Sequence, residues 1–170
     1  MSLTVERLKE VLFYDPYTGN FTWKKPTSNR VKLGSIAGVE DSQGYIAIRL
    51  DTVLYKAHRL AWLYCFEEWP VEFIDHINNI KSDNRLDNLR EATAQENCRN
   101  KVRQSNNTTG YIGVSYYAVN NKYRATIQVD NKTKHIGYYN TAEEASTAYK
   151  SKALELFGEF IYNESNTNLL

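Results

Sequence analysis

A polar stretch at residues 103–110 divides the chain into two segments, each of which needs a hydrophobic core of its own. The stretch is Arg-Gln-Ser-Asn-Asn-Thr-Thr-Gly, which has no apolar periodicity and the composition of a loop. A chain of 170 residues with 42% hydrophobic residues can bury one ordinary core or two small ones. The sequence therefore predicts two small α+β modules, at residues 1–102 and 110–164, with a linker at 103–109 and a tail at 165–170.

Apolar residues occur only in short segments of the chain. No stretch approaches the roughly 18 apolar residues of a membrane-spanning helix, and the first residues lack the basic start and apolar run of a secretory signal. We therefore expect a cytoplasmic protein without a membrane partner. Cys65 and Cys98 lack the paired spacing of zinc ligands, so we expect buried free thiols and no structural zinc.

Charge is unevenly distributed along the chain, although the formal net charge is only +1. Between Cys98 and His135 the sequence has seven basic residues against one acid, whereas glutamates dominate beyond Asn140. A basic middle segment beside an acidic helix indicates a single surface that faces phosphates. Ordinary solvated charge is the alternative interpretation of this pattern.

The first segment begins with short elements. Residues 4–12 predict a capped helix with one apolar face, and a turn follows at residues 14–19. Residues 21–23 and 45–50 alternate in the manner of strands, and residues 55–66 predict a strand that runs into an apolar helix. We expect this part to be a scaffold for the segment that follows.

The segment at residues 71–103 predicts the order strand, long polar loop, strand and helix. The first strand covers residues 71–74 and ends at Asp75 and His76, and the second covers residues 88–92. Thr93-Ala-Gln-Glu96 is a capping box that opens the helix.

Asp75 and His76 supply two groups that phosphodiester hydrolysis needs. A base must activate water, and a cation must stabilise the charge that grows on the phosphate and on the leaving oxygen. Successive side chains of a strand point to opposite sides, so we expect Asp75 to be free to bind a metal while His76 addresses water. Asn97, in the first turn of the helix, can supply a second oxygen ligand. A few hard oxygen ligands suit Mg²⁺ or Mn²⁺ better than zinc.

Each of these residues also has an ordinary explanation when it is taken singly. An Asp-His pair is common by chance, Asn88 can simply hold a turn, and Asn97 can be a surface amide. The arrangement as a whole carries more weight than its members.

Several runs in the first segment form one extended pattern. They are Tyr55-Lys-Ala-His-Arg-Leu-Ala-Trp62, Trp69-Pro70, Ile74-Asp-His-Ile-Asn-Asn, Asp83-Asn-Arg-Leu-Asp-Asn-Leu-Arg90-Glu-Ala-Thr93 and Glu96-Asn97, with Tyr14-Asp-Pro-Tyr-Thr-Gly19-Asn-Phe-Thr-Trp23 and Gly34-Ser-Ile-Ala-Gly38 upstream. In these runs, which span about the first 100 residues, the chain resembles the HNH endonucleases common in bacteriophages.

The resemblance implies a ββα-metal nuclease core. In such a core His76 is the general base, Asp75 is a metal ligand, and Asn88 braces the loop and the histidine. The third motif position, often a histidine in the wider family, is Asn97 here, which again favours a Mg²⁺-type cation; Asn100 is the fallback ligand. His58 is expected to be structural and hydrogen-bonded beneath the site.

The second segment predicts three strands and one helix. The strands lie at residues 113–117, 122–128 and 134–139, and a capping box at residues 141–144 opens a helix that Gly158 ends. In the middle strand one face is core, while the polar face carries Lys122, Arg124, Thr126 and Gln128. The alanine face of the helix should cover the core side of the sheet.

The uncovered face of this sheet suits the DNA major groove, because it carries Arg, Thr, Gln and His side chains. A solvated sheet with no ligand is the alternative. The relevant runs are Tyr111-Ile-Gly-Val114, Tyr123-Arg-Ala-Thr-Ile127, Ile136-Gly-Tyr-Tyr139, Thr141-Ala-Glu-Glu-Ala145, Ala148-Tyr149 and Asn163. Through them residues 108–164 resemble the AP2 DNA-binding domain.

That resemblance implies DNA contact from the outer sheet face. The positions that fall where the AP2 family reads DNA are Tyr117, Thr126, Gln128, Thr133 and His135. The arginines and tryptophans of plant members are mostly absent at these positions, so their GC-rich target is not implied.

Together these patterns predict an HNH-type endonuclease that nicks or cuts double-stranded DNA with one Mg²⁺ or Mn²⁺ ion and no small-molecule cofactor. Arg99, Lys101 and Arg103 are expected to contact backbone phosphates. We expect a monomer with a role in homing of a phage element. The main alternative is a non-catalytic, sequence-specific regulator that uses the nuclease fold as a scaffold, and a structural protein that does not bind DNA is a more distant one.

Overall fold

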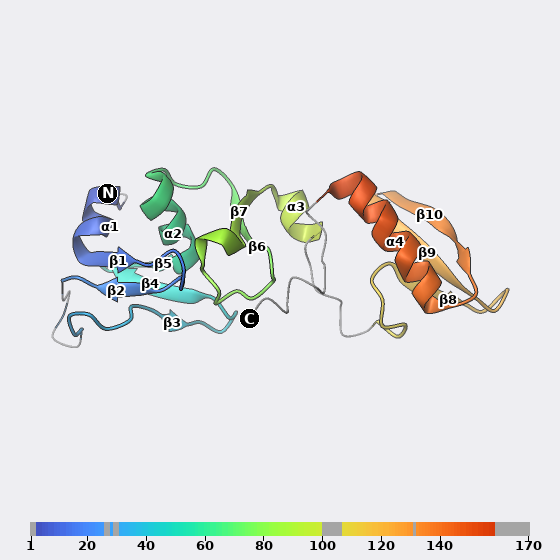
Figure 1. The fold of residues 1–170 in the computed structure, drawn as a ribbon, viewed down its shortest axis with the longest axis horizontal. Coiled ribbons are helices and arrows are strands. Elements are labelled where there is room, and N and C mark those ends of the chain that lie inside the picture. Colours follow the sequence, from blue (N-terminus) through green and yellow to red (C-terminus); the bar gives the residue numbers. More distant parts are fainter. Residues whose placement is uncertain (1–2, 26–27, 29–30, 100–106, 131, 159–170) are drawn as a thin grey trace. The chain divides into compact units, whose positions relative to one another are not determined.

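The computed structural model describes residues 3–25, 28, 31–99, 107–130 and 132–158, apart from the side chains of residues 98 and 99. The chain divides into two compact units, the first within Met1–Cys98 and the second within Arg99–Tyr162 (Figure 1). Both units combine short helices with small antiparallel sheets, which is the mixed α+β class that the sequence predicts.

The first unit is a series of short elements built around one core. In chain order these are α1 (Val5–Val11), β1 (Leu12–Tyr14), β2 (Phe21–Trp23), β3 (Val39–Glu40), β4 (Ile46–Leu50), β5 (Val53–Lys56), α2 (Ala57–Phe66), β6 (Phe73–His76), η1 (Leu86–Asn88), β7 (Leu89–Ala92) and α3 (Ala94–Arg99). The strands form the pairs β1-β2 and β6-β7 and the three-stranded sheet β3-β4-β5, all antiparallel.

Helix α1 starts where the sequence predicts it. The Thr4 hydroxyl oxygen accepts a hydrogen bond from the Arg7 amide at 3.3 Å, which satisfies one of the unpaired amides at a helix start. The helix ends at Val11, because Leu12 is extended and pairs with Trp23 in β2. The predicted helix is therefore one residue too long, and the strand β1 was not predicted.

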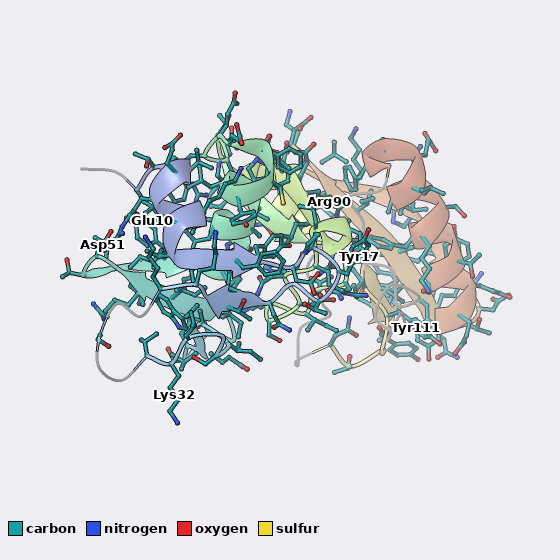
Figure 2. All side chains as sticks on the ribbon, turned by 60° about the vertical axis from the view of Figure 1, so that its left-hand side comes forward. Glu10, Tyr17, Lys32, Asp51, Arg90 and Tyr111 are labelled. Carbon is teal, nitrogen blue, oxygen red and sulfur yellow. The ribbon has the colours of Figure 1, made fainter. Side chains whose placement is uncertain are left out.

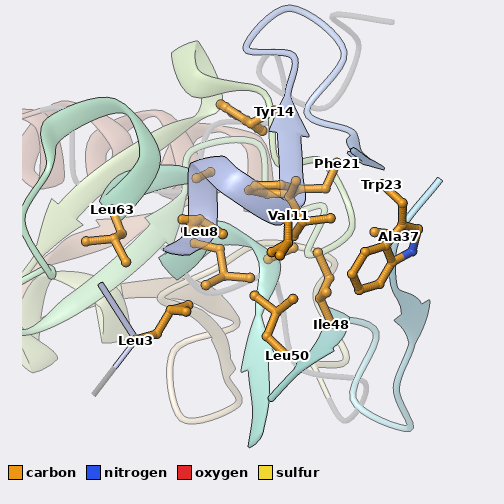
Figure 3. Packing of buried hydrophobic residues seen from close by; sticks show 14 of the residues in the cluster. Leu3, Leu8, Val11, Tyr14, Phe21, Trp23, Ala37, Ile48, Leu50 and Leu63 are labelled. Carbon is orange, nitrogen blue, oxygen red and sulfur yellow. The ribbon is translucent and has the colours of Figure 1, made fainter. Parts of the chain in front are cut away.

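The core of the first unit is continuous across α1, β1, β2, β4 and α2. Its largest fully buried side chains are Leu8, Val11, Leu12, Tyr14, Phe21, Ile48, Leu50 and Leu60. Figure 3 shows the packing of this core around Leu8, Val11 and Phe21. Ile74 and Leu89 of the β6–β7 hairpin belong to the same cluster. The hairpin is therefore anchored by its apolar side chains to the N-terminal elements, as expected for a scaffold.

The second unit is a three-stranded sheet packed on one helix. Its elements are β8 (Val114–Tyr117), β9 (Lys122–Val129), β10 (Lys132–Tyr139) and α4 (Ala142–Phe157). The sheet has the order β10-β9-β8, both pairs are antiparallel, and α4 packs against all three strands. The predicted strands and helix all occur, with bounds that differ by one or two residues.

Helix α4 lies on the face of the sheet that the sequence predicts to be core. Ala125 of β9 and Ala145 of α4 are fully buried between the two layers. The Thr141 hydroxyl oxygen accepts from the Glu144 amide at 3.1 Å, and the Glu144 carboxylate accepts from the Asn140 amide at 3.1 Å. The small alanine side chains allow α4 to lie close to the sheet. The hydrogen bonds of Thr141 and Glu144 fix the residue at which α4 begins.

Two further features concern helices and thiols. Among the described residues, no helix has the length and apolar character needed to span a bilayer. Cys65 is a free thiol that is half-buried, so the expectation of full burial is wrong; it lies on the face of α2 that only partly turns toward the core. The side chain of Cys98 lies outside the described residues.

Gly113 shows how closely α4 approaches the sheet. It has a φ of +72°, and a Cβ atom there would lie 2.2 Å from the ring of Tyr149 in α4 and 2.8 Å from the Thr126 carbonyl oxygen. We expect Gly113→Ala to destabilise the second unit by about 2–5 kcal/mol, because it adds both backbone strain and overlap. Denaturant unfolding followed by circular dichroism measures this loss.

Gly158→Ala is the matched control in the same unit. Gly158 also has a positive φ, of +58°, but nothing lies within 4 Å of the place that a Cβ atom would take there. Its loss should be limited to the backbone strain of about 1–3 kcal/mol. The three tryptophans all belong to the first unit, so their fluorescence transition should stay unchanged in both variants. Equal losses for the two variants would contradict the tight contact with Tyr149.

Candidate functional site

The chain from β6 to α3 has the predicted order of strand, loop, strand and helix. β6 pairs with β7 so that Asp75 lies opposite Arg90 and His76 lies opposite Leu89. The first strand differs from the prediction because it starts at Phe73 and includes both Asp75 and His76. Asn88 ends the 3₁₀ turn η1 just before β7.

His76 is buried in the hairpin, with 5% of its surface exposed. Its Nε2 atom lies 3.3 Å from Oδ1 of Asn84, and Nδ2 of Asn84 donates to the Ser82 carbonyl oxygen at 3.1 Å. Burial lowers the pKa of His76, and the hydrogen bond to Asn84 and the charge of Asp75 oppose this shift only in part. The ring is therefore neutral at neutral pH and can accept a proton.

Two more rings pack around His76. The His58 ring lies edge-on, with 5.0 Å between ring centroids and an interplanar angle of 84°. The Tyr45 ring lies 5.9 Å from His76 and 5.2 Å from His58. Burial lowers the pKa of His58 to about 3, so this ring is also neutral.

His58 therefore lies beside the site, but its contact differs from the expected hydrogen bond. Its Nδ1 atom is buried and has no hydrogen-bond partner in the part of the chain that the structure describes. The described contact between His58 and His76 is ring packing. This ring packing fills the space behind His76 and limits its rotation.

Asp75 is not free, in contrast to the expectation. Nε and Nη2 of Arg90 donate to Oδ2 of Asp75 at 2.9 and 2.8 Å, and the aspartate is 4% exposed. The antiparallel register places the two side chains directly opposite each other, and a buried carboxylate needs a counter-charge. Arg90 was not identified from the sequence. The available signal was that Asp75 and Arg90 each lie one residue away from the loop, so that a hairpin pairs them.

Asn88 braces the loop between the two strands. Its Oδ1 atom accepts from the Asn78 amide at 3.0 Å, and its Nδ2 atom donates to the Asp83 carbonyl oxygen at 2.8 Å. The loop held in this way carries Asn84, which contacts the His76 ring through its side-chain oxygen. Asn84 is a site residue that the sequence analysis did not identify.

Asn97 lies in the first turn of α3 and is half-buried. Its amide donates to the Thr93 carbonyl oxygen at 2.9 Å, and Thr93 and Glu96 form the predicted capping box through hydrogen bonds of 2.8 and 3.3 Å. The fallback ligand Asn100 and the phosphate contacts Lys101 and Arg103 lie outside the described residues, and Arg99 is described only in its backbone.

The donors near the hairpin are few and are mainly oxygens. Within the described ranges, no group of three or more His, Cys, Asp and Glu residues can hold a metal ion. A zinc site would need such a group, whereas Mg²⁺ is commonly held by one or two protein oxygens together with water and substrate phosphate. Asp75 with an amide oxygen fits the second kind of cation.

The predicted DNA contacts of the second unit share one face of its sheet. The register pairs Tyr117 with Lys122, Thr126 with His135, and Gln128 with Thr133, and directly paired residues lie on the same side. Ala125 and Ile127 alternate with them and are buried on the helix side. The outer face therefore carries the predicted contacts Tyr117, Arg124, Thr126, Gln128, Thr133 and His135.

Tyr138 belongs to this face although strict alternation excludes it. A bulge between His135 and Gly137 shifts the register, so that Tyr138 lies opposite Arg124. Its ring centroid is 4.6 Å from His135 and 5.2 Å from Tyr117, and the Arg124 guanidinium lies 5.6 Å from the Tyr117 ring centroid. These four side chains, Tyr117, Arg124, His135 and Tyr138, form a continuous cluster, which we call the outer cluster.

Comparisons with known proteins address the first unit. A family model described as HNH endonuclease matches residues 55–99. The chain is 40% identical over 88 residues to the "Uncharacterized HNH endonuclease L560" of Acanthamoeba polyphaga mimivirus, a match that covers 52% of this chain and 44% of that protein. It is 31% identical over 88 residues to "Protein 3.8" of Escherichia phage T7, a match that covers 52% of this chain and 72% of that protein. No solved structure matches the chain significantly.

The residues that match the family model contain the whole hairpin and α3. They include α2, β6, η1 and β7, and with them His58, Asp75, His76 and Asn88. The chain spans less than half of the mimivirus relative but more than two thirds of the phage relative. The chain therefore belongs to the family that includes Protein 3.8 of phage T7, and it carries an HNH endonuclease domain at residues 55–99.

Proposed function

We propose that this protein is a metal-dependent DNA endonuclease whose reaction takes place at the β6–β7 hairpin. The observation that carries the proposal is the neutral, buried His76 held beside Asp75 inside the matched HNH domain. A neutral imidazole in a fixed orientation is suited to accept a proton from water at neutral pH. The order of strand, loop, strand and helix supports the same assignment.

His76 acts as the general base in the proposed reaction. It takes a proton from a water molecule that attacks the phosphorus in line with the leaving 3′ oxygen, so the products carry 5′-phosphate and 3′-hydroxyl ends. Asp75 and Asn97 are the residues that would hold a Mg²⁺ or Mn²⁺ ion, which when bound stabilises the charge that grows on the phosphate and the leaving oxygen. Arg90 supplies the counter-charge of the buried Asp75 and orients its carboxylate.

The second unit serves, in this proposal, as a DNA-binding module of the AP2 type. A three-stranded sheet with a helix on one face and a polar outer face supports this assignment. Arg124, Thr126, Gln128, Thr133 and His135 would contact base edges and phosphates, while the tyrosines of the outer cluster supply apolar contact. Arg99, Lys101 and Arg103 would add contacts to the backbone phosphates.

A role in homing of a mobile element is our proposal for the biological setting, supported by the two viral relatives. The alternative is a regulator that binds DNA without cutting it. The two proposals differ in one measurable property, because only the endonuclease needs His76.

The first test is the conversion of supercoiled plasmid, or of the natural target once identified, to nicked and linear forms. We expect cleavage by the wild type with Mg²⁺ or Mn²⁺ and none with a chelator. His76→Ala should lower kcat by about 10²–10⁴-fold, because general base catalysis is lost. Lys32→Ala is the control, since Lys32 extends into solvent away from the unit in Figure 2.

Two outcomes of this test would change the assignment. Equal cleavage by wild type and His76→Ala would remove His76 from the role of base. Specific DNA binding by the wild type without cleavage of its bound target would favour the regulator.

The second test concerns the outer cluster. Tyr138→Ala should weaken DNA binding about tenfold, because it removes aromatic contact from the proposed DNA face, while the stability of the unit changes little. Tyr116→Ala is the matched control: this tyrosine is also about half exposed, but it pairs with Tyr123 on the opposite face. Fluorescence anisotropy with labelled duplex measures both. Equal effects of the two variants would argue against the outer face as the DNA surface.

A further inference from the structure

The turn at residues 14–19 packs against the middle of the loop between β6 and β7, although the contacting residues Tyr14 and Asn84 are 70 positions apart. We propose that this turn is a positioning element of the nuclease site, which acts on the His76 ring through Asn84. The inference rests on the proposed endonuclease function. It gives a role to the Tyr14-Asp-Pro-Tyr-Thr-Gly19 run, which the assignment of the active site leaves unused.

Two hydrogen bonds join the turn to the loop. The Tyr14 hydroxyl donates to the Asn84 carbonyl oxygen at 2.6 Å, and the Leu86 amide donates to the Pro16 carbonyl oxygen at 3.0 Å. Tyr14 is almost fully buried, and burial raises the pKa of its phenol well above the usual value. The phenol therefore keeps its proton at neutral pH and is a hydrogen-bond donor.

Gly19 allows the closest approach between the two segments. It is buried with a φ of +73°, and a Cβ atom there would lie 2.5 Å from both the Arg85 nitrogen and the Asn84 carbonyl carbon. Any side chain at this position would push the loop backbone at Asn84 away. The glycine is therefore required by the contact with the loop as well as by the turn itself.

The turn is rigid enough to act as a support, because Asp15 forms hydrogen bonds with later residues of the same turn. The Asp15 carboxylate accepts from the Tyr17 amide at 3.0 Å and from the Thr18 hydroxyl at 2.9 Å, and its carbonyl oxygen accepts from the Gly19 amide at 2.8 Å. An aspartate that folds its side chain back onto the following backbone is a common device of tight turns. Tyr14 at the start of the turn is fixed in the core by the rings of Phe21 and Tyr64.

Asn84 transmits the position of the loop to His76. Its side chain is oriented by donation from Nδ2 to the Ser82 carbonyl oxygen, so that the acceptor Oδ1 faces the imidazole Nε2. A ring nitrogen that faces an amide oxygen carries the proton, and the lone pair of the neutral ring is then on Nδ1. Asn84 thus orients the His76 ring, and its oxygen favours the tautomer with the proton on Nε2.

The loop has two sets of supports. The Asn88 side chain bonds to Asn78 near the start of the loop and to Asp83 in its middle, whereas the N-terminal turn bonds to the backbone of Asn84 and Leu86. Without the turn, Asp83 would still be held, but the Asn84 carbonyl oxygen would lose its hydrogen bond and Asn84 its fixed distance from the ring. Small displacements of a catalytic group lower the rate steeply, so this support should act on kcat.

The test is the variant Tyr14→Phe, which removes one hydroxyl and leaves the ring in place. We expect kcat to fall about tenfold with an unchanged KM, because the buried Tyr14 hydroxyl is not accessible to DNA. Tyr64→Phe is the matched control: Tyr64 packs against Tyr14, and its hydroxyl makes no hydrogen bond with the described residues. Both variants should be folded under the conditions of the assay, which denaturant unfolding checks.

A double-mutant cycle shows whether Tyr14 acts through Asn84. Asn84→Ala should lower kcat at least as much as Tyr14→Phe, and Asn84→Asp, which keeps an acceptor oxygen, should recover part of it. Tyr14→Phe should add little to Asn84→Ala, since the path from the turn to the ring is already broken. Equal factors for Tyr14→Phe in both backgrounds would overturn the proposal, as would an unchanged kcat.

The ring resonances of His76 provide a readout that needs no cleavage. In NMR spectra the His76 ring signals, assigned with His76→Gln, should shift in Tyr14→Phe and not in Tyr64→Phe. An inactive wild type would refute the endonuclease function while these shifts still reported on the positioning of the ring. Unchanged His76 signals in Tyr14→Phe would refute the positioning role whether or not the protein cleaves DNA.

Discussion

The β6–β7 hairpin is constrained by the burial of its polar side chains. The buried members are Asp75, His76, Asn78, Asn84 and Asn88. A buried polar group without a partner costs about 1–3 kcal/mol, and an unpaired buried charge costs more. Five such groups in one hairpin would be enough to unfold a small unit if they were left unsatisfied. The surrounding chain must therefore present donors and acceptors to them in a fixed pattern.

Several parts of the first unit supply hydrogen-bond or ion-pair partners to these buried polar side chains. Arg90 supplies the counter-charge for Asp75, and the Asn88 amide bonds to the backbone of the loop at two points. The N-terminal turn supplies the Tyr14 hydroxyl from a segment remote in sequence. The apolar core beneath, to which Ile74 and Leu89 belong, holds the hairpin in place while these polar contacts orient it.

The local signals in the sequence predicted the elements well. Apolar periodicity gave α1, α2 and α4, the Thr93 and Thr141 boxes gave the starts of two helices, and alternation gave the two faces of β9. The resemblance to HNH endonucleases, predicted for about the first 100 residues, was confirmed for residues 55–99. These features depend on residues close together in the chain, so a single sequence contains them.

The missed features depend on register or on distant contacts. Arg90 meets Asp75 only because the hairpin pairs these two positions, and a shift by one residue would separate them. Asn84 is one of many polar residues in the loop, and only its contact with His76 distinguishes it from the others. Tyr138 was assigned to no role because strict alternation from His135 places it on the wrong side. The DNA-contact and metal-ligand roles remain predictions.

The bulge in β10 has a consequence for how this sheet can change over evolutionary time. One extra residue at Ile136 decides which of the aromatic side chains at 138 and 139 faces outward. A regular strand of the same length would instead turn Tyr139 outward, whereas deletion of the extra residue would leave Tyr138 opposite Arg124. The ring that such a sheet presents to a ligand therefore depends on whether the strand keeps its bulge, without any substitution of the residues that touch the ligand.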